Sequence, residues 1–350
     1  MTKTAFITGV TGQDGAYLAE LLVNKGYHVH GMRRRTSQSN SRRVKHLLSD
    51  LRNGEGELTL HYADMTDASA IMSLISDIRP DEVYNLAAQS HVQVSFENPE
   101  YTADADALGV VRILEAIRLM GLKDTRFFQA STSEMFGNAP ETPQHENTVF
   151  QPASPYAAAK LYAYWLVRNY RDGYGLHASN GIMFNHESPL RGRHFVTRKV
   201  TRGVAAIHLG KQEKLLMGNL SSKRDWGHAA DFVKGMWQML QQDAPGDYVL
   251  ATGQTHSVRH MIELAFSHVD RTIEWVGQGV DEKGLDTRNG QILVEVDTNY
   301  FRPVDVQSLR GDAAKAKAEL GWQPEIALDA LIEEMVHADL ADLQAEQQSR

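Results

Sequence analysis

The sequence of 350 residues contains no cysteine, which excludes disulfide bonds, thiolate catalysis and cysteine-ligated zinc. It also has no excess of basic residues, because 36 Lys and Arg stand against 44 Asp and Glu and give a net charge of -8. Nucleic-acid-binding proteins usually present a basic field, so this balance argues against one. No apolar run is long enough to span a bilayer, and residues 3–8 are too short for a signal-peptide core. We therefore expect a soluble cytoplasmic protein with no membrane, nucleic-acid or metal partner.

Short apolar segments alternate with helical patterns through the first half of the chain. The segments that are typical of strands lie at residues 5–7, 27–30, 58–62, 82–86 and 126–130, and the helix-like stretches lie near 16–25, 67–78 and 101–120. Such alternation predicts βαβ units, which form a parallel sheet with right-handed crossovers and helices on both faces. We predict an α/β fold, a doubly wound parallel sheet of the Rossmann type.

Glycine and proline residues interrupt the pattern after Asn185. We expect residues 1–184 to form mainly the Rossmann domain. Residues 185–340 should form mainly a smaller α/β lobe that binds the substrate, with some segments returning to the Rossmann domain. The remaining residues, 341–350, are polar and rich in glutamine, which is typical of a tail at a frayed helix end.

A glycine-rich turn follows the first expected strand. Residues 9–15 read Gly-Val-Thr-Gly-Gln-Asp-Gly, with the spacing G-x-x-G-x-x-G, and they open a helix. Glycines there permit a tight turn and let backbone N–H groups approach a pyrophosphate, which the helix N-terminus also favours. A glycine turn can simply join a strand to a helix, but its place at the first βα junction favours a dinucleotide. The cofactor-binding residues expected in this turn are Gly9, Thr11, Gly12, Gln13, Asp14 and Gly15.

The end of the second strand favours NADP over NAD. NAD sites usually place Asp or Glu at this point to accept from the ribose 2′-hydroxyl. Here the sequence reads Arg33-Arg34-Arg35, and arginine pairs strongly with a 2′-phosphate. We predict NADP, bound by Arg34 and Arg35. A solvated basic loop and a nucleic-acid arm are the alternatives, and the rest of the basic segment 33–45 could face another subunit.

The third and fourth strands end in residues that suit the same cofactor. Asp64 could accept from the adenine amino group, and Met65 follows it directly. The segment 86–90 has small residues that let the backbone lie beside a cofactor, although Ala-Ala after a strand is also ordinary core packing. These two strand ends add Asp64, Met65, Leu86, Ala87, Ala88 and Ser90 to the predicted cofactor site.

Tyr156 and Lys160 follow Ser154-Pro155, which is a suitable N-cap with proline at the first helical position. The spacing of four residues places both side chains on one helical face. A nearby ammonium favours the phenolate, so we expect a lowered pKa for Tyr156 and a role as base. The Y-x-x-x-K pattern is common by chance, but it becomes informative downstream of a glycine loop.

A polar turn, Ser131-Thr132-Ser133-Glu134, ends the fifth expected strand. Open α/β sheets bind ligands at the carboxyl ends of their strands, so Thr132 and Glu134 should face the cofactor. The alternative is a turn with no role beyond structure. The joint order of glycine loop, strand-end threonine and Tyr/Lys pair favours the catalytic reading.

This order resembles the short-chain dehydrogenase/reductase superfamily, in the extended branch that acts on nucleoside-diphosphate sugars. The resemblance is closest to the GDP-mannose 4,6-dehydratases and runs over nearly the whole chain. The blocks that carry it are residues 7–15, 131–134, 184–189, 195–199 and 224–228. It implies an NADP-dependent lyase that dehydrates GDP-mannose, with the catalytic residues Thr132, Glu134, Tyr156 and Lys160. Glu134 would be the base at carbon 5, and Ser133 stands where dehydratases of the glucose type have an aspartate.

The resemblance also implies further contacts. For the cofactor they are Arg35, Asp64, Tyr101, Lys160, His186 and Arg191. For the substrate they are Ser90, Asn185, Val196, Lys199, Gly218, Arg224, Arg302 and Asp305. Leu190 and Asp305 depart from the pattern, because arginine and glutamate are usual there. The shorter side chain of Asp305 could weaken a ribose contact.

Several readings stay open at this stage. An epimerase or a 4-ketoreductase on a GDP-sugar is one alternative, and a dehydratase of a related GDP-sugar, such as a GDP-heptose, is another. A regulator that binds NADP without catalysis is a third, since a fold does not fix a function. The resemblance further implies a homodimer or a homotetramer.

Overall fold

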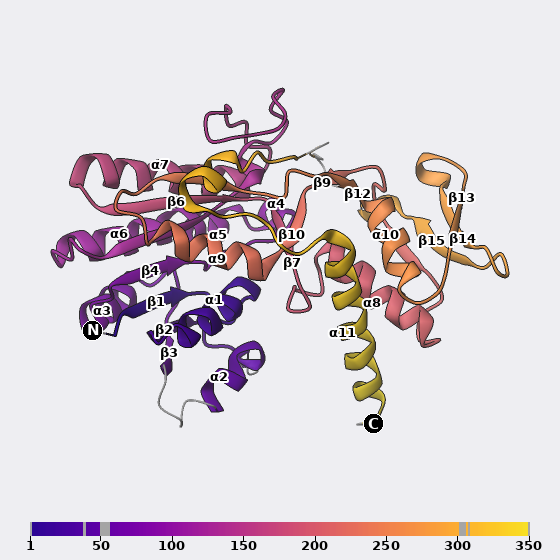
Figure 1. Cartoon of the computed structure of the whole chain (residues 1–350), viewed down its shortest axis with the longest axis horizontal. Coiled ribbons are helices and arrows are strands. Elements are labelled where there is room, and N and C mark those ends of the chain that lie inside the picture. The colour runs from indigo at the N-terminus through magenta and orange to yellow at the C-terminus, as the bar shows by residue number, and fades with distance from the viewer. Residues whose placement is uncertain (1, 38–39, 50–56, 301–305, 307–308, 349–350) are drawn as a thin grey trace.

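Seven parallel strands form the large sheet of the protein, whose computed structural model describes residues 2–37, 40–49, 57–300, 306 and 309–348 (Figure 1). Their order is β11-β6-β5-β4-β1-β2-β3, and all neighbouring pairs are parallel. The strands are β1 (Thr4–Thr8), β2 (His28–Arg33), β3 (Glu57–Tyr62), β4 (Glu82–Asn85), β5 (Arg126–Thr132), β6 (His177–Met183) and β11 (Asp247–Leu250). The predicted Rossmann-type sheet is confirmed, and the strand order reverses between β1 and β4, where such sheets bind ligands.

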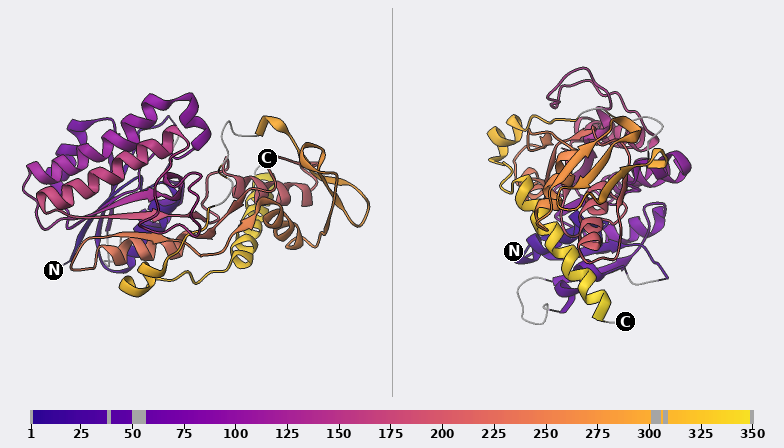
Figure 2. Two further views of the ribbon diagram at one scale, coloured as in Figure 1. Left: turned by 90° about the horizontal axis from the view of Figure 1, so that it is seen from above. Right: turned by 90° about the vertical axis from the view of Figure 1, so that its right-hand side faces the viewer.

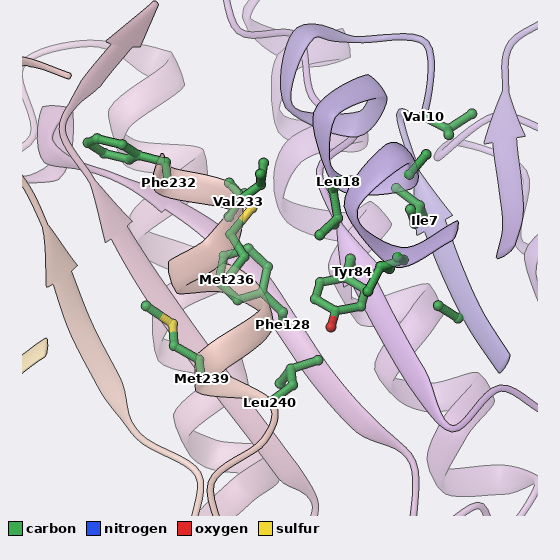
Figure 3. Close-up of a cluster of buried hydrophobic side chains, with 14 of the residues drawn as sticks. Ile7, Val10, Leu18, Tyr84, Phe128, Phe232, Val233, Met236, Met239 and Leu240 are labelled. Carbon is green, nitrogen blue, oxygen red and sulfur yellow. The ribbon is translucent and has the colours of Figure 1, made fainter. Parts of the chain in front are cut away.

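Helices cover both faces of this sheet (Figures 1 and 2). Their bounds are α1 (Gln13–Asn24) and α9 (Ala229–Met239) on one face, and α3 (Ala68–Ile78), α6 (Gly109–Leu119) and α7 (Pro155–Tyr174) on the other. Side chains alternate along a strand, so Ile7 packs into the first core and Phe6 into the second. Figure 3 shows Leu18 of α1 and Met236 of α9 among the side chains of the first core.

The stretch expected as one helix at 101–120 changes its helical type along its length. It begins as α5 (Pro99–Ala103), continues as a π-helical turn, η3 (Asp104–Leu108), and ends as α6. Three consecutive residues of η3 are buried, and Asp106 is the middle one. A π-helical turn inside a helix often marks a functional position.

A four-stranded sheet with three helices forms the smaller lobe, on the right of Figure 1. Its strands, in the order β13-β14-β15-β8, are β13 (Ile273–Val276), β14 (Lys283–Asp286), β15 (Ile292–Val296) and β8 (Leu215–Met217), and its helices are α8 (Val196–His208), α10 (Val258–Ser267) and α11 (Leu328–Gln348). Between the two sheets lie two short ladders, β7 (Asn185–Glu187) with β10 (Trp226–His228) and β9 (Lys223–Arg224) with β12 (His256–Ser257). Shorter elements are η1 (Arg42–Val44), α2 (Lys45–Ser49), α4 (Val92–Glu97), η4 (Ser133–Met135), η5 (Gly279–Asp281), η6 (Thr298–Tyr300) and η7 (Ala316–Leu320).

Helix α11, drawn in yellow in Figure 1, continues to Gln348, through the segment expected as a frayed end. Asp339 is fully buried and accepts from the side chains of Arg198 and Thr201 on α8. Farther along, Glu346 accepts from Arg202. These polar contacts hold the C-terminal half of α11 against α8. In the part of the chain that the structure describes, no helix combines the length and the hydropathy needed to cross a membrane.

Candidate active site

The glycine loop brings the end of β1 close to the end of β4. Gly9 has a φ of +68°, and a Cβ atom added there would lie 2.9 Å from the backbone of Ala87. A Cβ atom on Gly15 would lie 2.4 Å from the carbonyl oxygen of Gly9. Gly12 donates its N–H to the same oxygen at 2.9 Å. Only glycine fits at positions 9 and 15, and the result is the close backbone approach that a pyrophosphate site requires.

A buried polar chain holds the predicted segment at the end of β4. The Thr8 hydroxyl accepts from the N–H groups of Leu86 and Ala87, both at 3.1 Å, and donates to Asn85 at 2.7 Å. Asn85 in turn donates to Gln129 of β5 at 2.8 Å. The backbone beside the glycine loop is thereby fixed across three strands. Ala88 follows half-buried, and Ser90 is exposed at the end of this segment.

Gln13 and Asp14 bind strand β7, which leads into the smaller lobe. Gln13 donates to the carbonyl oxygen of His186 at 3.0 Å and accepts from Ser188 at 2.8 Å. Asp14 and the Nε2 atom of His186 form an ion pair at 2.9 Å. Burial opposes the charge on Asp14, but His186 outweighs it and lowers the pKa of Asp14 to about 2, while the pKa of His186 is raised. Predicted cofactor residues therefore also join the two parts of the molecule.

A pocket of about 480 Å³ opens at the ends of β2 and β3, and its lining contains Arg34, Arg35, Thr36, Tyr62, Ala63 and Asp64. Arg34 donates to the hydroxyl of Tyr101 at 2.8 Å, and the Arg35 guanidinium lies 4.5 Å from the centre of the Tyr62 ring. Asp64 accepts from the backbone and the hydroxyl of Thr66. The pocket thus gathers three predicted cofactor residues, Arg34 and Arg35 from the end of β2 and Asp64 from the end of β3.

Other predicted cofactor residues have structural contacts of their own. The side chain of Met65 is buried in the core, so only its backbone could reach a cofactor. The carbonyl oxygen of Thr11 accepts a hydrogen bond from Arg43 at 3.0 Å. The sequence alone gave no reason to distinguish Arg43 from the other basic residues of the segment 33–45. Arg191 lies beside Glu187 at 2.9 Å and over the Phe195 ring at 3.7 Å.

The predicted catalytic residues meet where β5 ends. Thr132 is the last residue of β5, and its hydroxyl accepts from the N–H of Glu134 at 3.2 Å. Ser154 caps α7 and Pro155 is its first residue, as predicted. The hydroxyl of Tyr156 is hydrogen-bonded to Thr132, and the Glu134 carboxylate acts electrostatically on it. The structure therefore brings a hydroxyl, a phenol and a carboxylate together.

Lys160 completes this group from the next turn of α7. Its Nζ atom donates to the carbonyl oxygen of Ala130 at 3.1 Å and lies 5.8 Å from the centre of the Tyr156 ring. Burial lowers the pKa of Lys160, and the charges of Asp106 and then Asp14 oppose this shift.

The prediction that the pKa of Tyr156 is lowered is wrong for the protein without a bound cofactor. Burial raises the pKa of Tyr156, and the Asp106 and Glu134 carboxylates raise it further. The hydrogen bond from Thr132 and the charge of Arg191 lower it, but they are outweighed. The spacing of four residues places Lys160 on the same helical face as Tyr156, but burial decides the direction in which the pKa of Tyr156 shifts.

Apart from Ser90, which follows β4, the predicted substrate residues that the structure describes lie at β7 or in segments after it. Asn185 begins β7, Val196 begins α8, and Lys199 is one turn farther along α8. The Lys199 Nζ atom lies 3.2 Å from the centre of the Tyr300 ring, and burial lowers the pKa of Lys199 to about 8 against the opposing charge of Asp297. A half-buried cation of this kind suits an anionic ligand.

Arg224 of β9 is buried and donates to the carbonyl oxygens of Lys223 and Val306, both at 2.8 Å. Gly218 lines a second pocket, of about 400 Å³, together with Arg259 and Glu282, and a Cβ atom there would lie 2.6 Å from the carbonyl oxygen of Tyr300. The two remaining predicted positions, Arg302 and Asp305, lie outside the residues that the structure describes.

Reasoning from the sequence did not identify one residue of the site, Asp106. This residue lies in η3, and its charge acts on both Tyr156 and Lys160. The only signal in the sequence is a carboxylate between Ala105 and Ala107 on a face that should be buried.

Comparison with known proteins connects this site with a family. The family model described as GDP-mannose 4,6 dehydratase matches residues 6–335. A GDP-mannose 4,6-dehydratase of Sinorhizobium fredii (strain HH103) is 59% identical over 347 residues, which cover 99% of each chain. The GDP-mannose 4,6 dehydratase of Homo sapiens is 53% identical over 340 residues, which cover 97% of this chain and 91% of the relative.

Solved structures share the fold at lower identity. The UDP-glucose 4-epimerase of Thermotoga maritima with UDP-glucose has a TM-score of 0.78 at 21% identity, with 97% of this chain and 99% of the other covered. RMD from Pseudomonas aeruginosa complexed with NADPH has a TM-score of 0.74 at 22% identity, with 97% and 100% covered.

Proposed function

The chain belongs to the GDP-mannose 4,6-dehydratase family, and we propose that it removes water from GDP-mannose to give the GDP-linked 4-keto-6-deoxy sugar. The observation that carries this proposal is the grouping of Thr132, Glu134, Tyr156 and Lys160 around one buried site. With a bound nicotinamide as hydride acceptor, a phenol, an ammonium and a hydroxyl are sufficient to oxidise a sugar hydroxyl reversibly. Loss of water also needs a base for the carbon-5 proton, and Glu134 is the carboxylate placed to supply it.

In the first step Tyr156 accepts the proton of the sugar 4-hydroxyl, while the Thr132 hydroxyl orients that oxygen. A bound nicotinamide would supply the acceptor and later the donor of the hydride, and its positive charge would favour the Tyr156 phenolate. Lys160 adds a positive charge near the Tyr156 ring. These charges must offset the raised pKa of Tyr156.

In the second step the 4-ketone makes the carbon-5 hydrogen acidic, and Glu134 removes it. The same carboxyl group then protonates the 6-hydroxyl, which leaves as water, because Ser133 stands where a separate aspartic acid serves in the dehydratases of the glucose type. Carbon 6 then gains the hydride that carbon 4 lost. Carbon 5 regains a proton, which balances the one that Tyr156 took from the 4-hydroxyl. The net reaction is the loss of one water with no net change in the cofactor.

NADP is the nicotinamide cofactor that the residues present favour. The absence of Cβ atoms at Gly9 and Gly15 lets the loop pack tightly against backbone atoms of the loop itself and of Ala87, which forms the tight turn that a pyrophosphate site requires. Arg34 and Arg35 line the pocket at the end of β2, where a 2′-phosphate would lie, and arginine suits such a phosphate. Asp64 lines the same pocket and could accept from adenine.

For the substrate, Lys199 and Arg224 supply cations for the diphosphate, and Asn185 supplies an amide near the sugar. These side chains recognise a GDP-linked hexose as a class, so a closely related GDP-sugar is the second substrate to test. We further propose a homodimer or a homotetramer in the cytoplasm. Tyr162 and Trp165 of α7, which are about half exposed, support association, and the mass of the protein in solution would test it.

The experiment is an assay with GDP-mannose and a catalytic amount of NADP. The expected product lacks one water by mass spectrometry, and absorbance shows no net formation of NADPH. A product of unchanged mass would indicate an epimerase and contradict the proposal. In a separate assay with NADPH and a GDP-linked 4-keto sugar, consumption of one NADPH for each sugar would indicate a ketoreductase.

A further inference from the structure

Asp106 is a carboxylate held inside the protein with half of its hydrogen-bonding capacity unused. Its side chain lies in η3 and is 1% exposed. One oxygen, Oδ1, accepts from the N–H of Gln89 at 2.7 Å. The other, Oδ2, is buried and has no hydrogen-bond partner among the described residues. A buried carboxylate oxygen without a partner is costly, so such a group needs a compensating charge nearby.

The compensating charge is the ammonium of Lys160. Lys160 is the one cation that acts strongly on Asp106, and Asp106 is the strongest of the charges that act on Lys160, ahead of Asp14. The only hydrogen bond found for the Lys160 ammonium goes to the neutral carbonyl oxygen of Ala130, within the described part of the chain. Asp106 is therefore the carboxylate that does most to stabilise the charged ammonium.

The π-helical turn separates two neighbouring aspartates. Asp104 begins η3 and is partly exposed, and it pairs outward with Arg112 at 2.6 Å. Asp106 is buried between two buried alanines, and η3 packs against α7. Its charge acts on Lys160 and also on Tyr156, on which Glu134 and Arg191 act from the other elements. Burial raises the pKa of Asp106 to about 6, and Lys160 opposes this rise.

We propose that Asp106 is a positioning residue for the dehydration: its carboxylate keeps the Lys160 ammonium charged and beside Tyr156. The catalytic part rests on the proposed function, whereas the pairing of the two charges does not. Asp106 acts on Tyr156 in two opposite ways. Its negative charge disfavours the phenolate directly, and the ammonium that it maintains favours the phenolate. The benefit is that the carboxylate opposes the lowering of the Lys160 pKa by burial and so favours the charged ammonium.

The test compares Asp106→Asn with Asp104→Asn. Asparagine keeps the shape of Asp106 and an oxygen for the Gln89 N–H, but it removes the charge. The pKa of Lys160 is measured by NMR on protein labelled with ¹³C at lysine Cε, and Lys160→Arg assigns the signal. The pKa of Lys160 should fall by about one unit or more in Asp106→Asn, which is the usual effect of losing a close opposite charge. It should stay unchanged in Asp104→Asn, and an unchanged value in both variants would overturn the proposal.

Activity against pH gives the second readout, taken as kcat/KM for GDP-mannose with saturating NADP. In Asp106→Asn both limbs of the profile should move to lower pH, because Tyr156 ionises more easily and Lys160 loses its proton earlier. A purely structural role would lower activity equally at every pH and would contradict the proposal. If wild-type protein does not dehydrate GDP-mannose, the proposed function fails, and the NMR titration still decides the pairing.

A reciprocal variant covers the case in which Asp106→Asn does not fold. In Lys160→Met the pKa of Asp106, followed with ¹³Cγ-labelled aspartate, should rise further because its counter-charge is gone. An Asp106 pKa that is the same with and without Lys160 would overturn the proposal.

Discussion

Lys199 gives the most direct prediction of a pH dependence. Its ammonium is half-buried beside Tyr300, and burial lowers the pKa of Lys199 to about 8. A bound diphosphate stabilises the charged form, so the pKa of Lys199 rises in the complex, and binding above pH 8 takes up a proton. The affinity for the substrate should therefore fall as the pH rises through 8. Below pH 7 this residue should contribute no further change.

The size of the effect follows from the fraction of protonated lysine. With a pKa of about 8, Lys199 is about 90% charged at pH 7 and about 10% charged at pH 9. If only the ammonium form binds, the Kd for GDP-mannose rises about tenfold between these pH values, which corresponds to about 1.4 kcal/mol. Partial binding by the neutral amine would make the rise smaller.

Isothermal titration calorimetry with GDP, which carries the same diphosphate but has no sugar to react, measures this dependence at pH 7, 8 and 9 on protein saturated with NADP. The matched control is Lys199→Arg, which keeps its charge throughout this range and so should lose the dependence. The control also removes any contribution from ionisation of the guanine, since that is common to both proteins. A wild-type Kd that stays flat, or a Kd that rises as steeply in Lys199→Arg, would refute the reasoning.

Three further predictions follow from the same structure. Glu134→Gln should lower kcat about 10²- to 10⁴-fold in the GDP-mannose assay, because the carbon-5 base is lost, and leave calorimetric binding of NADP and GDP unchanged; wild-type-like turnover would contradict the assignment. Arg35→Ala should weaken NADP binding about tenfold or more, since it removes a charged phosphate contact, and leave NAD binding unchanged in fluorescence titrations; equal losses for both cofactors would argue against a 2′-phosphate site. Asp339→Ala should lower the free energy of unfolding by about 3–5 kcal/mol, because it removes the closer, fully buried partner of Arg198, whereas Asp342→Ala, at a partly exposed carboxylate 3.6 Å from the same arginine, should cost less than about 1 kcal/mol; similar losses in urea denaturation would contradict this difference.

The parts of the fold that could be predicted are those set by local pattern. Short apolar segments that alternate with helical patterns located β1 to β5, and the glycine loop located the first βα junction. Strand β11 could not be placed in the same way, because it follows the first segments of the lobe and pairs with β6 through long-range contacts. Asp247 of β11 accepts from Arg171 and Asn180, and no local pattern reports such partners.

In the candidate site, too, the features set by local sequence could be predicted, whereas those set by contacts between distant segments could not. Spacing alone placed Tyr156 and Lys160 on one face of a helix, and a strand end placed Thr132 beside them. The direction of the Tyr156 pKa was wrong because it depends on burial and on Asp106, which comes from another helix. In the same way, the glycine loop predicted Gln13 at a cofactor, but its contacts with Ser188 and β7 arise only in the folded chain.

The central claim is that one site oxidises carbon 4, removes water and returns the same hydride to carbon 6. The most direct measurement uses GDP-mannose carrying deuterium at carbon 4, with a catalytic amount of unlabelled NADP. The product should lack one water and carry the deuterium at carbon 6, as located by NMR. A 4-keto product with no deuterium at carbon 6, or deuterium found in a pool of reduced cofactor, would contradict the account.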